Sequence, residues 1–446
     1  MFTHGKLEQV GLTSSVAGQG SFSVRLPPQP SSVAEARTHM RDLVVECDRE
    51  DLVESALLLT SEIVTNALLH AGTDIDVAGT VDAHGLLVEI GDGSAHLPSR
   101  RRYAATAGTG RGLLMLESMV DDWGVTSRPG GKTVWFRISG PENDLPDPIA
   151  PAPGVGRAEA AGDEVPVELR NMPLLLHAAW QEHAEALLRE YLLASLDADA
   201  SEASPKDPIQ VHAEATDAIA VLEEHVPSAT GMLRDDELMG DAVEPLVSAS
   251  RIEVPVPVTS VAHFETLDRT IEAALDLSQE GLVLTPPTQP EVQAFRRWLC
   301  RQVLGQAAGE RPEPWRVPEE ARHEPPAYDG WDSSIVTEAA HGLIAADASS
   351  RMLALSPKAE EILGYDAGEL VGRRIVSIVP ERYRQAHLAG FTMFLLVGRK
   401  PMIDHTVEVP ALRKDGSEVP VRLTVRRLSQ PGGYGVLLAD IEPVDD

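Results

Sequence analysis

The chain has 446 residues, a formal net charge of −31 at pH 7 and an aromatic content of only 4%. A chain of this length is expected to form two or three domains, each with its own core. The acidic balance argues against binding to a nucleic-acid backbone, because such binding requires clustered Lys and Arg. Any link to gene expression is therefore expected to run through other proteins.

The sequence shows no targeting signal and few cysteines. The opening residues MFTHGKLEQVGLTSS lack the basic flank and apolar stretch of a secretory signal, and no uninterrupted apolar run reaches membrane-spanning length. We therefore expect a cytoplasmic protein without membrane association. Cys47 and Cys300 fall in separate helix-like patterns, which predicts core positions and neither a disulfide framework nor a structural zinc site.

Two breaker-rich segments divide the chain into three parts. Residues 141–166 are rich in Pro, Ala, Gly and acidic residues without an apolar period, which is typical of an extended linker. Residues 306–332 form a second linker-like segment. Between them, residues 167–305 predict a small helical bundle, and we hypothesise that it transmits changes between the flanking domains. Its helices are expected at residues 174–196, 209–225 and 290–306.

The first part, residues 21–140, predicts an α+β sandwich with helices on one face of a mixed sheet. Apolar residues alternate in its strand-like segments and recur every three to four positions in its helix-like segments. Ser32 with Glu35, and Asp51 with Glu54, are expected to open two helices. In chain order we expect a strand at 22–26, these two helices, strands at 75–81 and 86–90, a helix at 113–122 and a strand at 133–138.

Three polar residues recur at a spacing of four on the second of these helices. Glu62, Asn66 and His70 therefore share one stripe, on the side away from the apolar face. The Asn oxygen is a hard ligand that suits magnesium, and the Glu carboxylate can accept a proton from an attacking hydroxyl or water. Taken alone, the spacing is more typical of an ordinary solvated helix face.

Two further elements suit a nucleotide. The strand that ends in Asp92-Gly93 places a carboxylate at the mouth of the sheet, where it can accept a hydrogen bond from an adenine amino group. An ordinary turn has the same pattern. Residues 108–112, GTGRG, precede a helix, so backbone N–H groups and the charge of Arg111 can approach phosphate. The segment lacks the Gly-Lys-Ser/Thr of a Walker loop.

The order of these elements resembles the GHKL superfamily of ATP-binding domains. The segments SEIVTNALLHAG, VEIGDGSAHLP, GTGRGLLMLESMVDDWG and GGKTVWF occur in order and are most similar to those of the anti-sigma-factor serine kinases. The resemblance covers residues 21–140 and implies ATP and Mg2+ as cofactors. The roles it implies are general base for Glu62, magnesium and nucleotide contact for Asn66, adenine contact for Asp92 with the adjoining Gly93, phosphate-loop contacts for Gly110, Arg111 and Gly112, and polar support for Thr133.

Departures from the family pattern bear on the reaction. The segment after Asp92 reads Gly-Ser-Ala-His and not the Asp-x-Gly-x-Gly of histidine kinases, and no helix with a phosphoacceptor His precedes the domain. We therefore expect phosphate transfer to a Ser or Thr of a regulatory protein, such as a sigma factor or an anti-sigma antagonist. Two alternatives stay open: a non-catalytic ATP-binding adaptor that sequesters its partner, and a histidine kinase-like protein with its acceptor on another chain.

The C-terminal part, residues 333–446, predicts two strands, several helices and a three-stranded meander. With its segments LGYDAGELVGR and RKDGSEVPV it resembles PAS domains, which implies a five-stranded sheet that holds a ligand or a partner helix. The position of His387 resembles that of the haem ligand in oxygen-sensing PAS domains, but Val407 stands where their distal Arg is expected. Haem through His387 is thus an alternative, and the PAS ligand stays open.

Together these patterns predict a multidomain α+β protein with a GHKL α/β sandwich, a helical middle region and a PAS-fold domain. The expected function is that of an ATP-dependent signalling regulator whose kinase activity the PAS domain controls. A homodimer is compatible with both resemblances.

Overall fold

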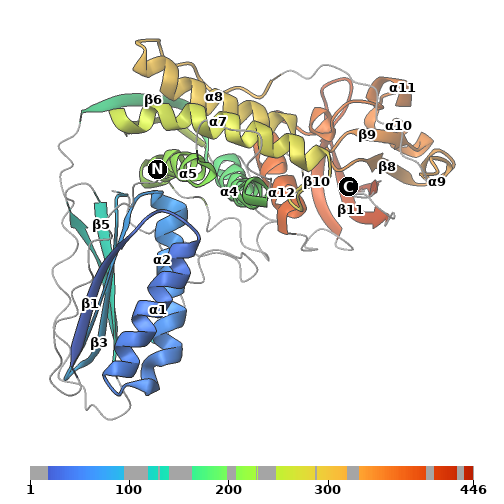
Figure 1. The fold of residues 1–446 in the computed structure, drawn as a ribbon. Coiled ribbons are helices and arrows are strands. Elements are labelled where there is room, and N and C mark those ends of the chain that lie inside the picture. The colour runs from blue at the N-terminus through green and yellow to red at the C-terminus, as the bar shows by residue number, and fades with distance from the viewer. Residues whose placement is uncertain are drawn as a thin grey trace, which may run out of the picture. The chain divides into compact units, whose positions relative to one another are not determined.

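The computed structural model divides the chain into two compact units, each with its own strands and its own buried residues (Figure 1). One unit comprises Met1–Asp163 and Ala198–Val221, and the other comprises Glu164–Asp197 and Leu222–Asp446. The structure describes residues 19–94, 119–128, 131–139, 163–197, 207–227, 229, 248–286, 289–318, 331–397, 406–428 and 436–444.

The N-terminal unit is built on a five-stranded sheet with two long helices on one face (Figure 1). The strand order is β1-β2-β3-β5-β4, and every neighbouring pair is antiparallel, so the mixed sheet expected from the sequence is wrong. The elements are β1 (Gly20–Leu26), α1 (Ser31–Glu46), α2 (Val53–Ala71), β2 (Ile75–Asp82), β3 (Gly85–Asp92), β4 (Asp122–Arg128) and β5 (Gly131–Ile138).

Alternation along the strands builds the core of this unit. Ile75, Val77 and Val81 of β2 point to one face of the sheet and are almost fully buried. The apolar stripe of α2, including Ile63 and Val64, is buried in the same core, and α2 packs against α1 and β3. By length and composition Glu50–Ala71 is apolar enough to cross a membrane, but half of that window is buried inside the unit, as in a core helix.

The helix starts differ from those expected. The Ser32 hydroxyl donates to the Pro27 carbonyl oxygen at 2.7 Å, so it does not cap α1. Asp51 instead accepts from the Arg49 guanidinium at 3.0 Å, and α2 begins only after a short 3-10 turn, Glu50–Leu52. Strand β4 was not predicted at all, and it begins where the expected helix at 113–122 should end. Most of that helix lies outside the described residues.

The middle of the chain is mainly helical, as the sequence predicts, but it also contains two strands that the sequence analysis did not predict. Strands β6 and β7 pair antiparallel as a two-stranded sheet. The expected linker at 306–332 is also partly packed, because the Trp315 side chain is buried and its backbone N–H donates to the Arg170 carbonyl oxygen at 3.0 Å. The elements are β6 (Glu164–Pro173), α4 (Leu174–Asp197), α5 (Pro208–His225), β7 (Ser248–Pro257), α7 (Val258–Gln279) and α8 (Pro290–Ala307).

The C-terminal segment forms the expected five-stranded antiparallel sheet, in the order β10-β11-β12-β8-β9. Its inner face packs with α10 and α11 around an apolar core that includes Met352, Leu363 and Val421. The elements are α9 (Ser334–Thr337), β8 (Gly342–Ala346), β9 (Met352–Leu355), α10 (Pro357–Leu363), α11 (Ala367–Leu370), α12 (Arg384–Val397), β10 (Thr406–Leu412), β11 (Glu418–Leu428) and β12 (Val436–Pro443).

This C-terminal sheet domain belongs to one compact unit with the middle region, apart from Ala198–Val221, and α12 packs along α4 (Figure 1). Arg374 is fully buried and donates to the Glu291 carboxylate of α8 at 3.0 Å. Gln289, which precedes α8, accepts from Arg374 at 3.3 Å and donates to Leu388 O and Thr392 Oγ1 of α12 at 3.3 and 3.2 Å. A buried polar network thus joins α8 to the sheet domain.

Candidate functional site

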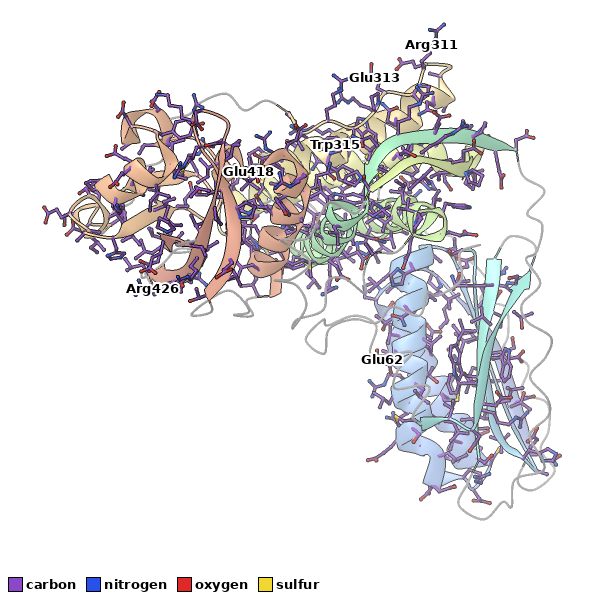
Figure 2. The ribbon with its side chains drawn as sticks, turned by 180° about the vertical axis from the view of Figure 1, so that it is seen from behind. Glu62, Arg311, Glu313, Trp315, Glu418 and Arg426 are labelled. Carbon is purple, nitrogen blue, oxygen red and sulfur yellow. The ribbon has the colours of Figure 1, made fainter. Side chains whose placement is uncertain are left out.

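Helix α2 presents an acid and an amide whose side chains form no hydrogen bond or ion pair with the residues that the structure describes. Glu62 lies midway along α2 (Figure 2) and Asn66 one turn later, and both side chains are half-buried. Their other hydrogen bonds are those of the helix backbone. His70, a turn further on, is exposed. The stripe expected from the spacing therefore leaves two oxygen-bearing groups available to a ligand.

Asp92 is a carboxylate that continues an apolar row of β3. Because strand side chains alternate, Asp92 points to the same face as Val88 and Ile90, the face on which α2 packs. Asp92 is only 3% exposed. Its Oδ1 accepts from Lys132 Nζ at 3.0 Å and from the backbone N–H of Ser94 at 2.8 Å. Oδ2 has no hydrogen-bond partner among the residues that the structure describes.

Lys132, and not Thr133, lies beside Asp92. The register of β3 with β5 pairs Asp92 with Lys132 and Gly91 with Thr133. Alternation therefore directs Lys132 toward the helix-covered face and Thr133 toward the opposite face, so the polar support expected from Thr133 falls to its neighbour. Sequence reasoning missed Lys132, although a charged residue in the apolar row Val134, Phe136 and Ile138 was a usable signal.

Two close backbone approaches hold the end of β3 in place. The Gly93 N–H donates to Thr73 Oγ1, just beyond α2, at 2.8 Å, and a Cβ at Gly93 would stand at the same distance from that hydroxyl. A Cβ at position 131 would lie 2.0 Å from the Asp92 carbonyl oxygen. Only glycine at this position therefore lets the start of β5 lie so close to the end of β3. Thr73 was not predicted, and no sequence pattern distinguishes it from an ordinary turn residue.

The glycine loop cannot be assessed in the same way. Gly110, Arg111 and Gly112 lie outside the described residues, and their phosphate-binding role stays a prediction. What the described residues supply is a set of hard oxygen donors on α2 and a carboxylate at the end of β3. Such donors suit a magnesium-bound triphosphate, because magnesium prefers carboxylate, amide and phosphate oxygens.

His387, the residue that the sequence suggests as a haem ligand, lies on α12. Burial, together with the nearby charge of Arg374, lowers the pKa of its imidazole to about 4. Its Nε2 is buried without a hydrogen-bond partner among the described residues. A neutral imidazole could bind iron, but here it faces a guanidinium that disfavours any added positive charge. Haem binding through His387 stays a prediction.

Comparison with known families matches both ends of the chain. Residues 26–138 match the model of the histidine kinase-like ATPase domain, and residues 332–441 match the model of the PAS fold. The first match contains Glu62, Asn66, Asp92 and Lys132, and the second contains Arg374.

Similarity to individual proteins is limited to parts of the chain. A protein of Azorhizobium caulinodans described only as uncharacterized is 32% identical over 105 residues, which are 23% of this chain and 14% of that protein. The PAS domain of an HTR-like protein from Haloarcula marismortui is 21% identical, with a TM-score of 0.20, over 25% of this chain and 88% of that one. A quorum-sensing receptor PAS domain from Cronobacter turicensis is 15% identical, with a TM-score of 0.21, over 25% and 99%.

Proposed function

We propose that this chain, which carries a histidine kinase-like ATPase domain and a PAS domain, is a protein serine/threonine kinase of the anti-sigma-factor type. At a coarser level the two domains make it an ATP-dependent signalling regulator with a PAS sensor. The observation that carries the finer proposal is that the side chains of Glu62 and Asn66 on α2 have no polar partner among the described residues. A pure docking module has no need of an acid and an amide left free one helical turn apart.

In the proposed reaction the hydroxyl oxygen of a Ser or Thr on a partner protein attacks the γ-phosphorus of ATP. The bond to the bridging oxygen breaks, ADP leaves with its electron pair, and Glu62 accepts the hydroxyl proton. Asn66 would hold Mg2+, which supplies neutralising charge to the triphosphate. Asp92 would accept a hydrogen bond from the adenine amino group and so fix the base.

The PAS domain would control this activity through the middle region. Support comes from the buried network of Arg374, Gln289 and Glu291, because it joins the PAS domain to α8 and gives a change of packing a route to that helix. The partner would be a cytoplasmic regulatory protein such as a sigma factor or an anti-sigma antagonist. Both the partner and the location stay proposals.

The test is a phosphotransfer assay with partner proteins captured in the presence of ATP and Mg2+. We expect an acid-stable phosphoprotein whose mapped site is a Ser or Thr. An acid-labile product would instead indicate a histidine kinase-like reaction. Nucleotide binding and partner capture without any transfer would indicate the adaptor.

A further inference from the structure

Lys132 is a buried lysine that the proposed reaction does not use. Its side chain is 7% exposed and that of Asp92 is 4% exposed, with 3.0 Å between Nζ and Oδ1. A buried lysine is costly unless its charge is paired, and this one is paired with the carboxylate that is expected to contact the base.

The contacts of the two carboxylate oxygens are unequal. Oδ1 accepts two hydrogen bonds, from Lys132 and from the Ser94 N–H, whereas Oδ2 accepts none within the described residues. Two donors on one oxygen fix the rotation of the carboxylate about its side-chain bond and direct the second oxygen. An anionic oxygen held in this way is a strong acceptor for one N–H group.

We propose that Lys132 is a positioning residue for nucleotide recognition: it holds Asp92 as an oriented anion whose Oδ2 accepts the exocyclic amino group of adenine. The inference rests on the proposed nucleotide site and deepens it, because it assigns base selectivity to the pair and not to Asp92 alone. Without the lysine, the buried carboxylate loses its compensating charge and one of the two donors that fix it.

The test compares the binding of ATP and of purine riboside triphosphate, which lacks the 6-amino group. Calorimetry with the full-length chain and Mg2+ is expected to give at least about tenfold tighter binding of ATP, because loss of the amino group leaves a buried acceptor unpaired. Lys132→Arg should keep this preference, since it keeps the charge. Lys132→Met should reduce it to less than about twofold, and Lys132→Gln serves if the Met variant melts before the assay temperature.

Arg137→Met is the matched control. Arg137 lies on the same strand and donates to Asp82 at 3.1 Å in a more exposed ion pair, so its loss should leave the preference for ATP unchanged. The inference is overturned if Lys132→Met and Lys132→Gln keep the native preference, or if they weaken both nucleotides equally as a purely structural residue would. If the native chain binds neither nucleotide, the proposed function fails as well.

Discussion

Two buried ion pairs, one in each unit, show how the same interaction serves different ends. Asp92–Lys132 in the N-terminal unit and Glu291–Arg374 in the C-terminal unit both have an N–O distance of 3.0 Å and side chains no more than 7% exposed. Burying two charges brings little net stability on average, because their desolvation offsets their attraction. Each pair therefore invites an explanation beyond stability.

The surroundings of the two pairs supply that explanation. Asp92 and Lys132 come from neighbouring strands of one sheet, and an oxygen of Asp92 remains without a described partner. Glu291 and Arg374 come from different parts of the fold, and Gln289 extends their contact to α12. The first arrangement suits a ligand, and the second suits the joining of a sensor domain to its neighbour.

The largest expected effect is on the rate of phosphotransfer, and it comes from Glu62, which belongs to neither ion pair. Glu62→Gln should lower the rate of phosphotransfer by about 10²- to 10⁴-fold, because it removes the proposed proton acceptor. Nucleotide affinity should stay close to native in calorimetry. Glu54→Gln makes the same chemical change at an exposed position of the same helix and should leave the rate unchanged. Equal rates for Glu62→Gln and the native chain would exclude the proposed role.

The next effect tests whether the second pair holds two parts of one unit together. Arg374→Met leaves Glu291 buried without its partner and should lower the free energy of unfolding by about 3–5 kcal/mol. Urea unfolding followed by tryptophan fluorescence is suitable, because four of the six Trp residues, including the buried Trp180, Trp298 and Trp315, lie in this unit.

Two further variants control that measurement. Arg374→Met combined with Glu291→Leu should be more stable than Arg374→Met alone, since no charge is then left unpaired. Lys358→Met breaks an exposed pair with Glu361 and should cost less than about 1 kcal/mol. If Arg374→Met is as mild as Lys358→Met, the pair does not join the two parts.

The two pairs also mark what the sequence could and could not predict. Alternation and helical spacing located β1, β2, β3, α4 and α8 because each presents one apolar face over many residues. Strand β4 was not predicted because none of its side chains is buried, so its sequence shows no alternating row of apolar residues. Strands β6 and β7 contain Pro166 and Pro255, which argue against a strand except in an edge position such as this two-stranded sheet provides.

The sequence predicts residues of the candidate site only where a family motif specifies one position. The motifs predict Glu62, Asn66 and Asp92 as site residues, and these stay predictions, whereas the motif that contains Lys132 drew attention to Thr133. Pairing across strands decides which of two adjacent residues faces the helices, and the sequence alone does not state the register. Arg374 and Glu291 are far apart in the chain, so no local pattern could have joined them.

A smaller effect concerns how the stability of the C-terminal unit depends on pH. Burial lowers the pKa of His177 and of His183 in the C-terminal unit to about 4 from an ordinary value of 6.5. The unfolded chain therefore binds protons below pH 6.5 that the folded chain does not, so stability is lost as the pH falls from 6.5 toward 4. Each histidine should cost about 2 kcal/mol between pH 7 and pH 5.

His177→Phe isolates this contribution. The ring stays within the aromatic cluster around Phe295, but it can no longer take up a proton. The variant should therefore lose about 2 kcal/mol less than the native chain between pH 7 and pH 5, as measured by urea unfolding through Trp fluorescence. An identical pH dependence would mean that His177 is protonated in the folded unit.

The smallest effect concerns the support of the first pair. Thr73→Val removes the hydroxyl that accepts from the Gly93 N–H and should loosen the end of β3, with a loss of about two- to fivefold in ATP affinity. Thr38→Val is the control, because the Thr38 hydroxyl donates to Ala34 O on the exposed side of α1, and no other partner of it lies among the described residues. The preference for ATP over purine riboside triphosphate should survive in both variants, since Lys132 still orients Asp92. If Thr73→Val abolished that preference, the orientation of the Asp92 carboxylate would depend on the turn after α2 and not on Lys132.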